Sequence, residues 1–218
     1  MIRIVAVHTA MALVEPLNKL FKEHLPEVKL NHIADDSLIP EVIANNCVTP
    51  AVRRRLFSYY NAAADSGADV VFNCCSSVGK VAEMGDEIAP IKVFRIDGPM
   101  AEKAVREGRK IGVIATLPTT LGPTVALLED KAREAGREIE IVEGLAKGAF
   151  GADKATHDGL IEQEAMRLAD EVDVIVLAQG SMAAMEEKLA AMTGKIVLSS
   201  PLLGILGLKA YLKEKGLL

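Results

Sequence analysis

The chain has 218 residues, which is long enough to bury a substantial core in one large α/β domain or in two small lobes. Half of the residues are hydrophobic and only 4% are aromatic, so the core must consist of Ala, Val, Ile, Leu and Met. The net charge of −5 argues against a nucleic-acid-binding protein, because such proteins normally carry a basic surplus.

The cysteines and the apolar runs indicate a soluble, cytoplasmic protein. Three cysteines, two of them adjacent, cannot form a disulfide framework, and this pattern is typical of a reducing compartment. The apolar run after Arg3 stops at His8 and is too short for a secretion signal. No stretch approaches the roughly 18 apolar residues of a membrane span, so we expect no membrane partner.

Short β-branched runs alternate with helix-period stretches along the whole chain. The predicted strands cover residues 2–7, 29–33, 70–73, 92–96, 110–115, 139–143, 172–178 and 195–198. The predicted helices cover residues 14–24, 50–66, 99–106, 119–134, 158–170, 182–192 and 201–215. Near-continuous apolar strands separated by amphipathic helices predict the α/β class, with parallel sheets covered on both faces.

The chain also repeats itself. Three pairs of segments match in the same order: 3–9 with 110–116, 67–75 with 171–179, and 91–99 with 194–201. The spacing from Thr9 to Cys75 is close to that from Thr116 to Gln179. We therefore expect two pseudosymmetric lobes, residues 1–108 and 109–218, whose strand ends face one cleft. The C-terminal helix could pack back on the first lobe.

The most informative segment is 72–80, where an apolar strand runs into two thiols and two hydroxyls. Ligands of open α/β sheets bind beyond the carboxyl ends of the strands. A thiol there, at a helix N-terminus, can have its pKa lowered from about 8.5 towards neutrality, which makes Cys75 the candidate catalytic thiol. Ser76, Ser77 and the free backbone N–H groups suit a substrate carboxylate. Strand alternation aims Cys74 away from its neighbour, so we expect Cys74 to be structural.

Two histidines are candidates for an acid or a base. His8 ends the first strand, and its simpler interpretation is a ring held by a backbone partner. His157 precedes Asp158, which a helix cap would explain equally well. The candidate substrate contacts at other strand ends and helix starts are Thr9, Thr116, Thr119, Thr120, Gln179, Gly180 and Ser181.

Other sites are disfavoured. Three consecutive arginines, residues 53–55, lie near two tyrosines, but on an acidic protein such a helix more often forms a solvated or subunit-contacting face. The glycines at 144, 148 and 151 lack the spacing of a dinucleotide site. No His, Cys or carboxylate grouping has metal-ligand spacing, so we expect neither a metal nor a nucleic-acid partner.

Strand-to-cysteine motifs in two like halves resemble the aspartate/glutamate/hydantoin racemase superfamily, which includes cofactor-independent racemases and related decarboxylases and isomerases. The likeness covers nearly the whole chain and is most specific at residues 75–77, 111–120 and 174–182. It implies a site in the cleft between two lobes, no cofactor, and a homo-oligomer. It also implies that Cys75 takes the first thiol position and that Ser76 and Ser77 hold the substrate carboxylate.

The second thiol position departs from the family pattern, because this chain has Gln179 where the racemases carry Cys. A Gln side chain can orient a substrate but cannot relay a proton. The resemblance implies an isomerase that moves a proton at the carbon next to the carboxylate of a small amino, hydroxy or dicarboxylic acid, with His8 or His157 available as the second group. The alternatives are a one-thiol decarboxylase or cis–trans isomerase of a malonate- or maleate-type dicarboxylate, and a non-catalytic binding protein for an anionic metabolite.

Overall fold

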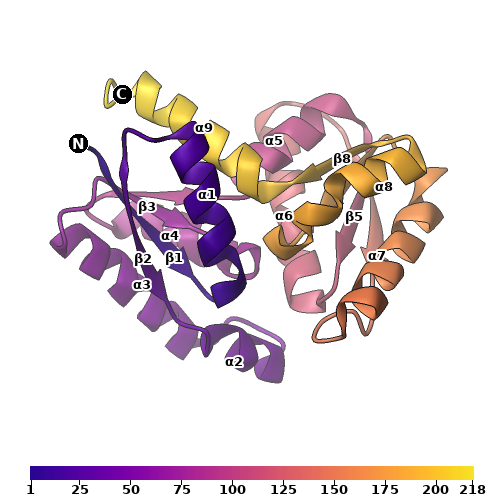
Figure 1. Cartoon of the computed structure of the whole chain (residues 1–218), viewed down its shortest axis with the longest axis horizontal. Helices are drawn as coiled ribbons and strands as arrows, with labels where there is room; N and C mark the ends of the chain where they lie inside the picture. Colours follow the sequence, from indigo (N-terminus) through magenta and orange to yellow (C-terminus); the bar gives the residue numbers. More distant parts are fainter. The chain divides into compact units, whose positions relative to one another are not determined.

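A computed structural model describes residues 1–218 and shows two parallel four-stranded sheets flanked by helices (Figure 1). The chain divides into two compact units, residues 1–97 together with 201–218, and residues 98–200. The α/β class predicted from the alternating pattern is therefore confirmed, with one parallel sheet in each unit.

The first unit contains the sheet with strand order β2-β1-β3-β4. Its strands are β1 (Arg3–His8), β2 (Lys29–Ala34), β3 (Val70–Asn73) and β4 (Lys92–Arg95). Its α-helices are α1 (Val14–His24), α2 (Leu38–Asn45), α3 (Pro50–Asp65), α4 (Gly79–Ile88) and α9 (Ser200–Glu214). Two short 3-10 helices, η1 (Met11–Leu13) and η2 (Ser76–Val78), follow the ends of β1 and β3.

The second unit contains the sheet with strand order β6-β5-β7-β8. Its strands are β5 (Lys110–Ala115), β6 (Glu140–Leu145), β7 (Val174–Leu177) and β8 (Ile196–Ser199). Its helices are α5 (Gly98–Glu107), α6 (Pro118–Glu134), α7 (Lys154–Ala169), the 3-10 helix η3 (Gly180–Met185) and α8 (Glu186–Thr193). Both sheets therefore have the same strand order and connection pattern, as the repeat in the sequence predicts.

The alternation of β1 explains why the first sheet is covered on both faces. Ile4 and Ala6 pack in one buried cluster with residues of α1 and α9. Val5 and Val7 pack in a second cluster with residues of α2, α3 and α4. Figure 1 shows these helices on the two sides of the sheet. Because strands β1 and β3 are level at their carboxyl ends, where Val7 pairs with Asn73, the residues that follow them lie at one edge of the sheet.

The structure corrects three expectations about element boundaries. No helix was expected between residues 34 and 49, but α2 lies there; Pro40 stands in its first turn, where no N–H is needed, and the helix has only eight residues. Helix α7 begins at Lys154 rather than 158, because the Asp153 carboxylate accepts from the N–H groups of Ala155 and Thr156. Within the expected helix at 182–192, the first residues belong to η3.

The expected boundary between the two halves, after residue 108, also differs from the boundary of the compact units. Helix α5 belongs to the second unit, because it packs against α6 and β7. The last helix, α9, belongs to the first unit and supplies Ile205, Leu208 and Leu212 to its core.

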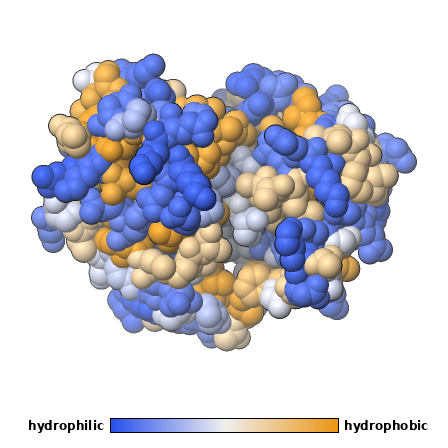
Figure 2. Space-filling model, in the orientation of Figure 1, coloured by the Kyte–Doolittle hydropathy of each residue, from blue (hydrophilic) through white to orange (hydrophobic).

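Hydrophilic residues cover much of the face seen in Figure 2, with hydrophobic residues in smaller patches between them. None of the helices combines the length and the apolar composition that a membrane span requires.

Gly204 allows α9 to approach the end of β4 closely. A Cβ atom at this position would lie 2.4 Å from the backbone oxygen of Ile96 and 2.8 Å from its Cγ1. We expect Gly204→Ala to lower the free energy of unfolding by about 1–3 kcal/mol, because backbone atoms cannot move aside cheaply. The control is Gly159→Ala in α7, where a Cβ meets nothing within 4 Å. There the better helix propensity of Ala should raise stability by up to about 1 kcal/mol. Urea unfolding measures both; equal effects would contradict the prediction.

Candidate active site

Cys75 stands where β3 turns into η2, at the carboxyl edge of the first sheet. Its backbone is extended, with φ −133° and ψ 119°, and the ladder of hydrogen bonds to β1 continues as far as Cys74, whose N–H donates to Val7 at 3.0 Å. The side chain of Cys75 is partly exposed and packs against the cluster of α3 and α4. The strand end thus presents one partly exposed thiol.

The polar groups around Cys75 and its burial have opposite effects on the pKa of its thiol. Burial raises the pKa of the Cys75 thiol, while hydrogen bonds from the Thr9 hydroxyl and from the backbone N–H groups of Ser77 and Val78 favour the thiolate and lower it. The Ser77 hydroxyl adds a further contribution in the same direction. The expectation of a lowered thiol pKa is therefore wrong for this structure, because desolvation outweighs the hydrogen bonds. At neutral pH the thiol is a proton donor.

Cys74 is a buried core residue, as strand alternation predicts. It is 6% exposed, and it packs with Phe72 and residues of α1 and α9 on the opposite face of the sheet from Cys75. Its thiol donates to the backbone oxygen of Phe72 at 3.3 Å. Burial raises the pKa of Cys74 well above its usual value.

Two polar residues that the sequence analysis missed hold the turn at Cys75. The Asn73 side chain donates through Nδ2 to the backbone oxygen of Cys75 at 3.0 Å, and the buried Tyr60 hydroxyl donates to Asn73 Oδ1 at 3.1 Å. A polar residue at the end of an otherwise apolar strand is the signal that could have identified Asn73. Its partner on α3 could not be found without the fold.

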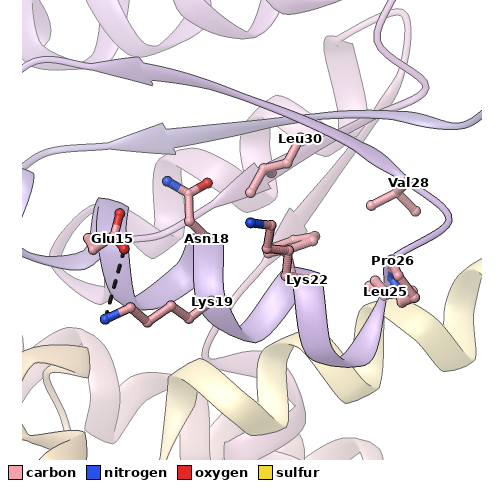
Figure 3. Close-up of a pocket in the computed structure, with 9 residues that line it drawn as sticks. Glu15, Asn18, Lys19, Lys22, Leu25, Pro26, Val28 and Leu30 are labelled. Atoms are coloured by element: carbon pink, nitrogen blue, oxygen red, sulfur yellow. Dashed lines mark ion pairs between the residues drawn. The ribbon is translucent and has the colours of Figure 1, made fainter.

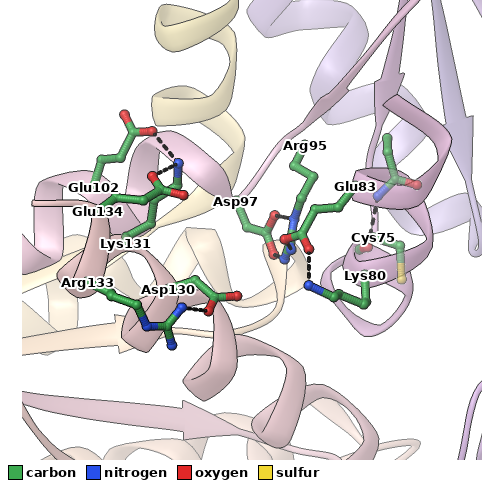
Figure 4. A network of polar contacts seen from close by, with 11 residues as sticks. Cys75, Lys80, Glu83, Arg95, Asp97, Glu102, Asp130, Lys131, Arg133 and Glu134 are labelled. Atoms are coloured by element: carbon green, nitrogen blue, oxygen red, sulfur yellow. Dashed lines mark hydrogen bonds and ion pairs between the residues drawn. The ribbon is translucent and has the colours of Figure 1, made fainter. Parts of the chain in front are cut away.

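A buried ion pair lies next to this turn, between β4 and α4 (Figure 4). Arg95 donates to both carboxylate oxygens of Asp97, through Nε at 2.9 Å and through Nη2 at 2.8 Å, and its Nη1 pairs with Glu83. The Arg95 side chain is 10% exposed and that of Asp97 is 1% exposed. A Cβ atom on Gly79, the first residue of α4, would overlap the guanidinium, so glycine at this position makes room for Arg95.

His8 is a buried, neutral histidine at the end of β1. Its Nε2 lies 2.9 Å from Nδ1 of His32 on β2, and the ring is 1% exposed. Burial and the neighbouring His32 lower the pKa of His8 to about 4. The backbone partner that the sequence suggested is also present, since the N–H of Asp35 donates to the His8 oxygen at 3.0 Å. His8 is therefore uncharged near pH 7 and carries no proton that it could release as an imidazolium.

The low pKa of His8 predicts acid sensitivity. Between the pKa of about 6.5 in the unfolded chain and the value of about 4 in the folded protein, only the unfolded state binds the proton. His8 therefore leaves the free energy of unfolding unchanged above pH 6.5. Below pH 6.5 it lowers this free energy increasingly, by about 3 kcal/mol near pH 4. The lowered pKa of His32 acts in the same direction. We expect the free energy of unfolding by urea to fall from pH 7 to pH 4.5, and to fall less in His8→Gln. Parallel pH profiles of the two proteins would contradict this.

The second sheet carries an equivalent strand-end pair, Thr116 and Gln179. The Thr116 N–H donates to Gln179 Oε1 at 2.8 Å, and Gln179 Nε2 lies 2.6 Å from Thr116 Oγ1. Gln179 has an extended backbone at the start of η3, as Cys75 has at the start of η2. Thr9 contacts Cys75 in the first unit as Thr116 contacts Gln179 in the second. The repeat predicted that these positions are equivalent in the two halves, and their side-chain contacts are equivalent as well.

The other predicted contacts are distributed over the same sheet ends. Ser76 and Ser77 are buried in η2, next to Cys75. In the second unit, Thr119 and the buried Thr120 lie in the first turn of α6, and Gly180 and the exposed Ser181 begin η3.

His157 lies in the first turn of α7, with its Nδ1 2.9 Å from Oδ1 of Asp158. The two adjacent side chains face each other, although neighbours on a helix rarely do. Asp153, not Asp158, caps the helix. No group of three or more His, Cys, Asp or Glu side chains is placed to hold a metal ion.

The fold and the polar strand ends define a class of protein built from two like α/β units. The structure superposes on the allantoin racemase from Klebsiella pneumoniae with a TM-score of 0.74 and 16% identity, over 100% of this chain and 89% of that one. It superposes on the glutamate racemase from Francisella tularensis with a TM-score of 0.75 and 16% identity, over 100% and 83%. For an unliganded arylmalonate decarboxylase the TM-score is 0.60 at 14% identity, over 95% and 91%. At these identities the likeness shows a shared fold.

The sequence itself identifies the family. The Asp/Glu/Hydantoin racemase family model matches residues 2–205, and the chain belongs to this family. No curated protein matches the chain in sequence.

Proposed function

We propose that the protein is a cofactor-independent isomerase that transfers a proton at the carbon next to a carboxylate of a small amino, hydroxy or dicarboxylic acid. The observation that carries this proposal is the partly exposed Cys75, which stands at the end of β3 with a thiol that burial keeps protonated at neutral pH. Membership of the racemase family supports the same class of reaction. We further propose that the enzyme works in the cytoplasm as a homo-oligomer, without a metal.

The proposed reaction passes through an enolate-like carbanion. A basic group on one face of the carbon takes the α-proton, the electron pair of the C–H bond moves into the carboxylate, and the protonated Cys75 thiol gives its proton to the opposite face. Hydroxyls and N–H groups at Ser76, Ser77, Thr116 and Thr120 are the proposed donors to the negative charge that develops there. Return of a proton to the opposite face inverts the carbon. His8, whose neutral ring can take up a proton, and His157 are the candidates for the basic group, and Gln179 is proposed to orient the substrate.

Two observations favour a second candidate, a one-thiol decarboxylase of a malonate-type acid. The raised pKa of Cys75 leaves its proton on sulfur at neutral pH. The equivalent position in the second unit is an amide, whose two polar atoms bond to Thr116. Loss of CO₂ generates the carbanion without a base, and one protonated thiol then suffices to deliver the proton.

A single experiment separates these reactions. The protein is incubated in deuterated water with amino acids, hydroxy acids, hydantoins, malonates and maleate, and the reaction is followed by NMR and polarimetry. Uptake of deuterium with loss of optical rotation is the expected result. Uptake with release of CO₂ would replace the main proposal with the decarboxylase. Tight binding of an acid without any uptake would indicate a binding protein.

A further inference from the structure

Strand β2 forms an open edge of the first sheet. It stands at one end of the strand order β2-β1-β3-β4, and all of its residues are exposed or half-buried. A surface groove lies on each side of it. One groove, of about 510 Å³, runs between α1 and β2 past Leu30 (Figure 3). The other, of about 290 Å³, is lined by Lys29, Asn31 and Ile33 on the opposite face of the sheet. A further strand could therefore approach β2 from the side.

The backbone of β2 directs every second residue out of the sheet. Lys29 and Asp35 donate their N–H groups into the sheet, to the backbone oxygens of Ile2 at 2.7 Å and His8 at 3.0 Å. The N–H and C=O of one strand residue point to the same side, and those of the next residue point to the other side. The residues that turn both groups away from β1 are therefore Leu30, His32 and Ala34.

The other sheet edges are closed, whereas β2 is not. On β4, the outward N–H of Val93 donates to Asp86 of α4 at 2.9 Å. On β6, the outward oxygen of Glu143 accepts from Arg167 of α7 at 2.8 Å. Strand β8 is buried except for its first residue. The hydrogen bonds of the chain include none to the outward groups of β2. Unpaired edges of this kind pair readily with another strand, so β2 is the edge that remains available.

Strand β2 is complementary to a second copy of itself. An antiparallel pair with its two-fold axis at His32 places Leu30 opposite Ala34 of the second copy. In this register, outward residues face outward residues, and about six backbone hydrogen bonds can form between the copies. The exposed Lys29 of each copy then lies at the carboxyl end of the other β2, which the exposed Asp36 follows. Opposite charges thus meet at both ends of the pair.

The equivalent edge of the second sheet lacks this complementarity. Strand β6 pairs with β5 as β2 pairs with β1, and it begins with Glu140 where β2 begins with Lys29. In the corresponding self-pairing, the exposed Glu143 would lie opposite Glu143 of the second copy. Like charges directly opposite each other destabilise a strand pair. The charge pattern therefore favours association through β2 and opposes it through β6.

We propose that two copies of this chain associate through antiparallel pairing of their β2 strands, so that the two first sheets join into one continuous sheet. This goes beyond the proposed homo-oligomer, because it assigns the interface, and it does not depend on the proposed reaction. The side chain of His32 keeps its contacts in its own copy, at 2.9 Å to His8 and 2.9 Å to Asn18. The pairing therefore uses only the backbone of His32.

Amide hydrogen exchange measures the interface directly. The wild-type protein is studied by NMR from micromolar to millimolar concentration, and light scattering gives its mass. We expect a dimer to form, and the amides of Leu30, His32 and Ala34 to exchange more slowly as it forms. The amides of Asn31 and Ile33, which bond to β1, should be protected at every concentration. A protein that stays monomeric would overturn the proposal and leave this edge to a strand of another protein. A dimer in which the outward amides of β2 exchange as fast as in the monomer would overturn the interface but not the homo-oligomer.

Exchange of the two charges tests the register. Lys29→Glu and Asp36→Lys should each raise the dissociation constant of the dimer about tenfold, because each sets like charges together at both ends of the pair. The double variant Lys29→Glu/Asp36→Lys should return to within about threefold of the wild type, because opposite charges meet again. Glu140→Lys, at the equivalent position of β6, is the control and should leave the dissociation constant unchanged. Sedimentation at several concentrations measures all four. Single variants that associate as tightly as the wild type, or a double variant weaker than both, would overturn the proposed pairing.

Discussion

Cys75→Ala should abolish most turnover, lowering kcat by about 10²–10⁴-fold, while the protein stays folded. The thiol is the group that exchanges a proton with the carbon in either proposed reaction, and general acid–base catalysis by one side chain contributes about 10²–10⁴-fold. The side chain is only partly buried, so its removal costs little packing. Deuterium uptake into the substrate measures the loss, and circular dichroism checks the fold.

Cys74→Ala is the matched control, because it removes the same atom one residue away. Its sulfur lies in the core on the opposite face of the sheet, so the variant should lose stability by about 1–2 kcal/mol and keep most of its turnover. If Cys75→Ala remained active, or if Cys74→Ala were the inactive one, the thiol assignment would be wrong.

Asp97→Ala should lower the free energy of unfolding by about 3–5 kcal/mol. Both oxygens of this carboxylate bind Arg95, and both side chains are buried, so the variant leaves a guanidinium in the interior with only Glu83 beside it. Urea unfolding at pH 7 measures the change. Catalysis should also suffer, since this ion pair lies against the start of α4, close to the turn that presents Cys75.

The control for Asp97 is Asp130→Ala, which breaks an exposed Asp–Arg pair. Asp130 lies 2.7 Å from Arg133, one turn away on α6, and the two side chains are 36% and 73% exposed (Figure 4). Solvent screens such a pair, so its loss should change stability by less than about 0.5 kcal/mol. Similar losses in the two variants would show that burial does not strengthen the Asp97 pair.

The sequence was sufficient where a local pattern decides the structure. The short β-branched runs between helix-period stretches predicted the strands, and the repeat predicted two like halves, which the two sheets of equal strand order match. The opposite directions of Cys74 and Cys75 followed from strand alternation alone. Helix α2 was missed because its eight residues and its proline resemble a loop.

The parts of the site that could not be predicted depend on contacts across the fold. The bond from His8 to His32 requires the register of β1 with β2, and the bond from His32 to Asn18 requires the packing of α1. The Thr9 contact of Cys75 was not foreseen for the same reason. The predicted direction of the pKa shift of Cys75 was wrong, because burial, which no sequence pattern measures, outweighs the hydrogen-bond donors that favour the thiolate.

The threonine at each sheet end has a consequence for how such enzymes could diverge. Thr9 and Thr116 make the same kind of contact, one with an ionisable sulfur and the other with an amide. The threonine hydroxyl contacts Cys75 in one unit and Gln179 in the other, and the backbone at the two strand ends is alike. Natural selection could therefore exchange an ionisable side chain for an amide at this position while the backbone stays in place. Either unit could thus lose or regain an ionisable side chain at its strand end through a single substitution. New reactions could then arise without a change of fold.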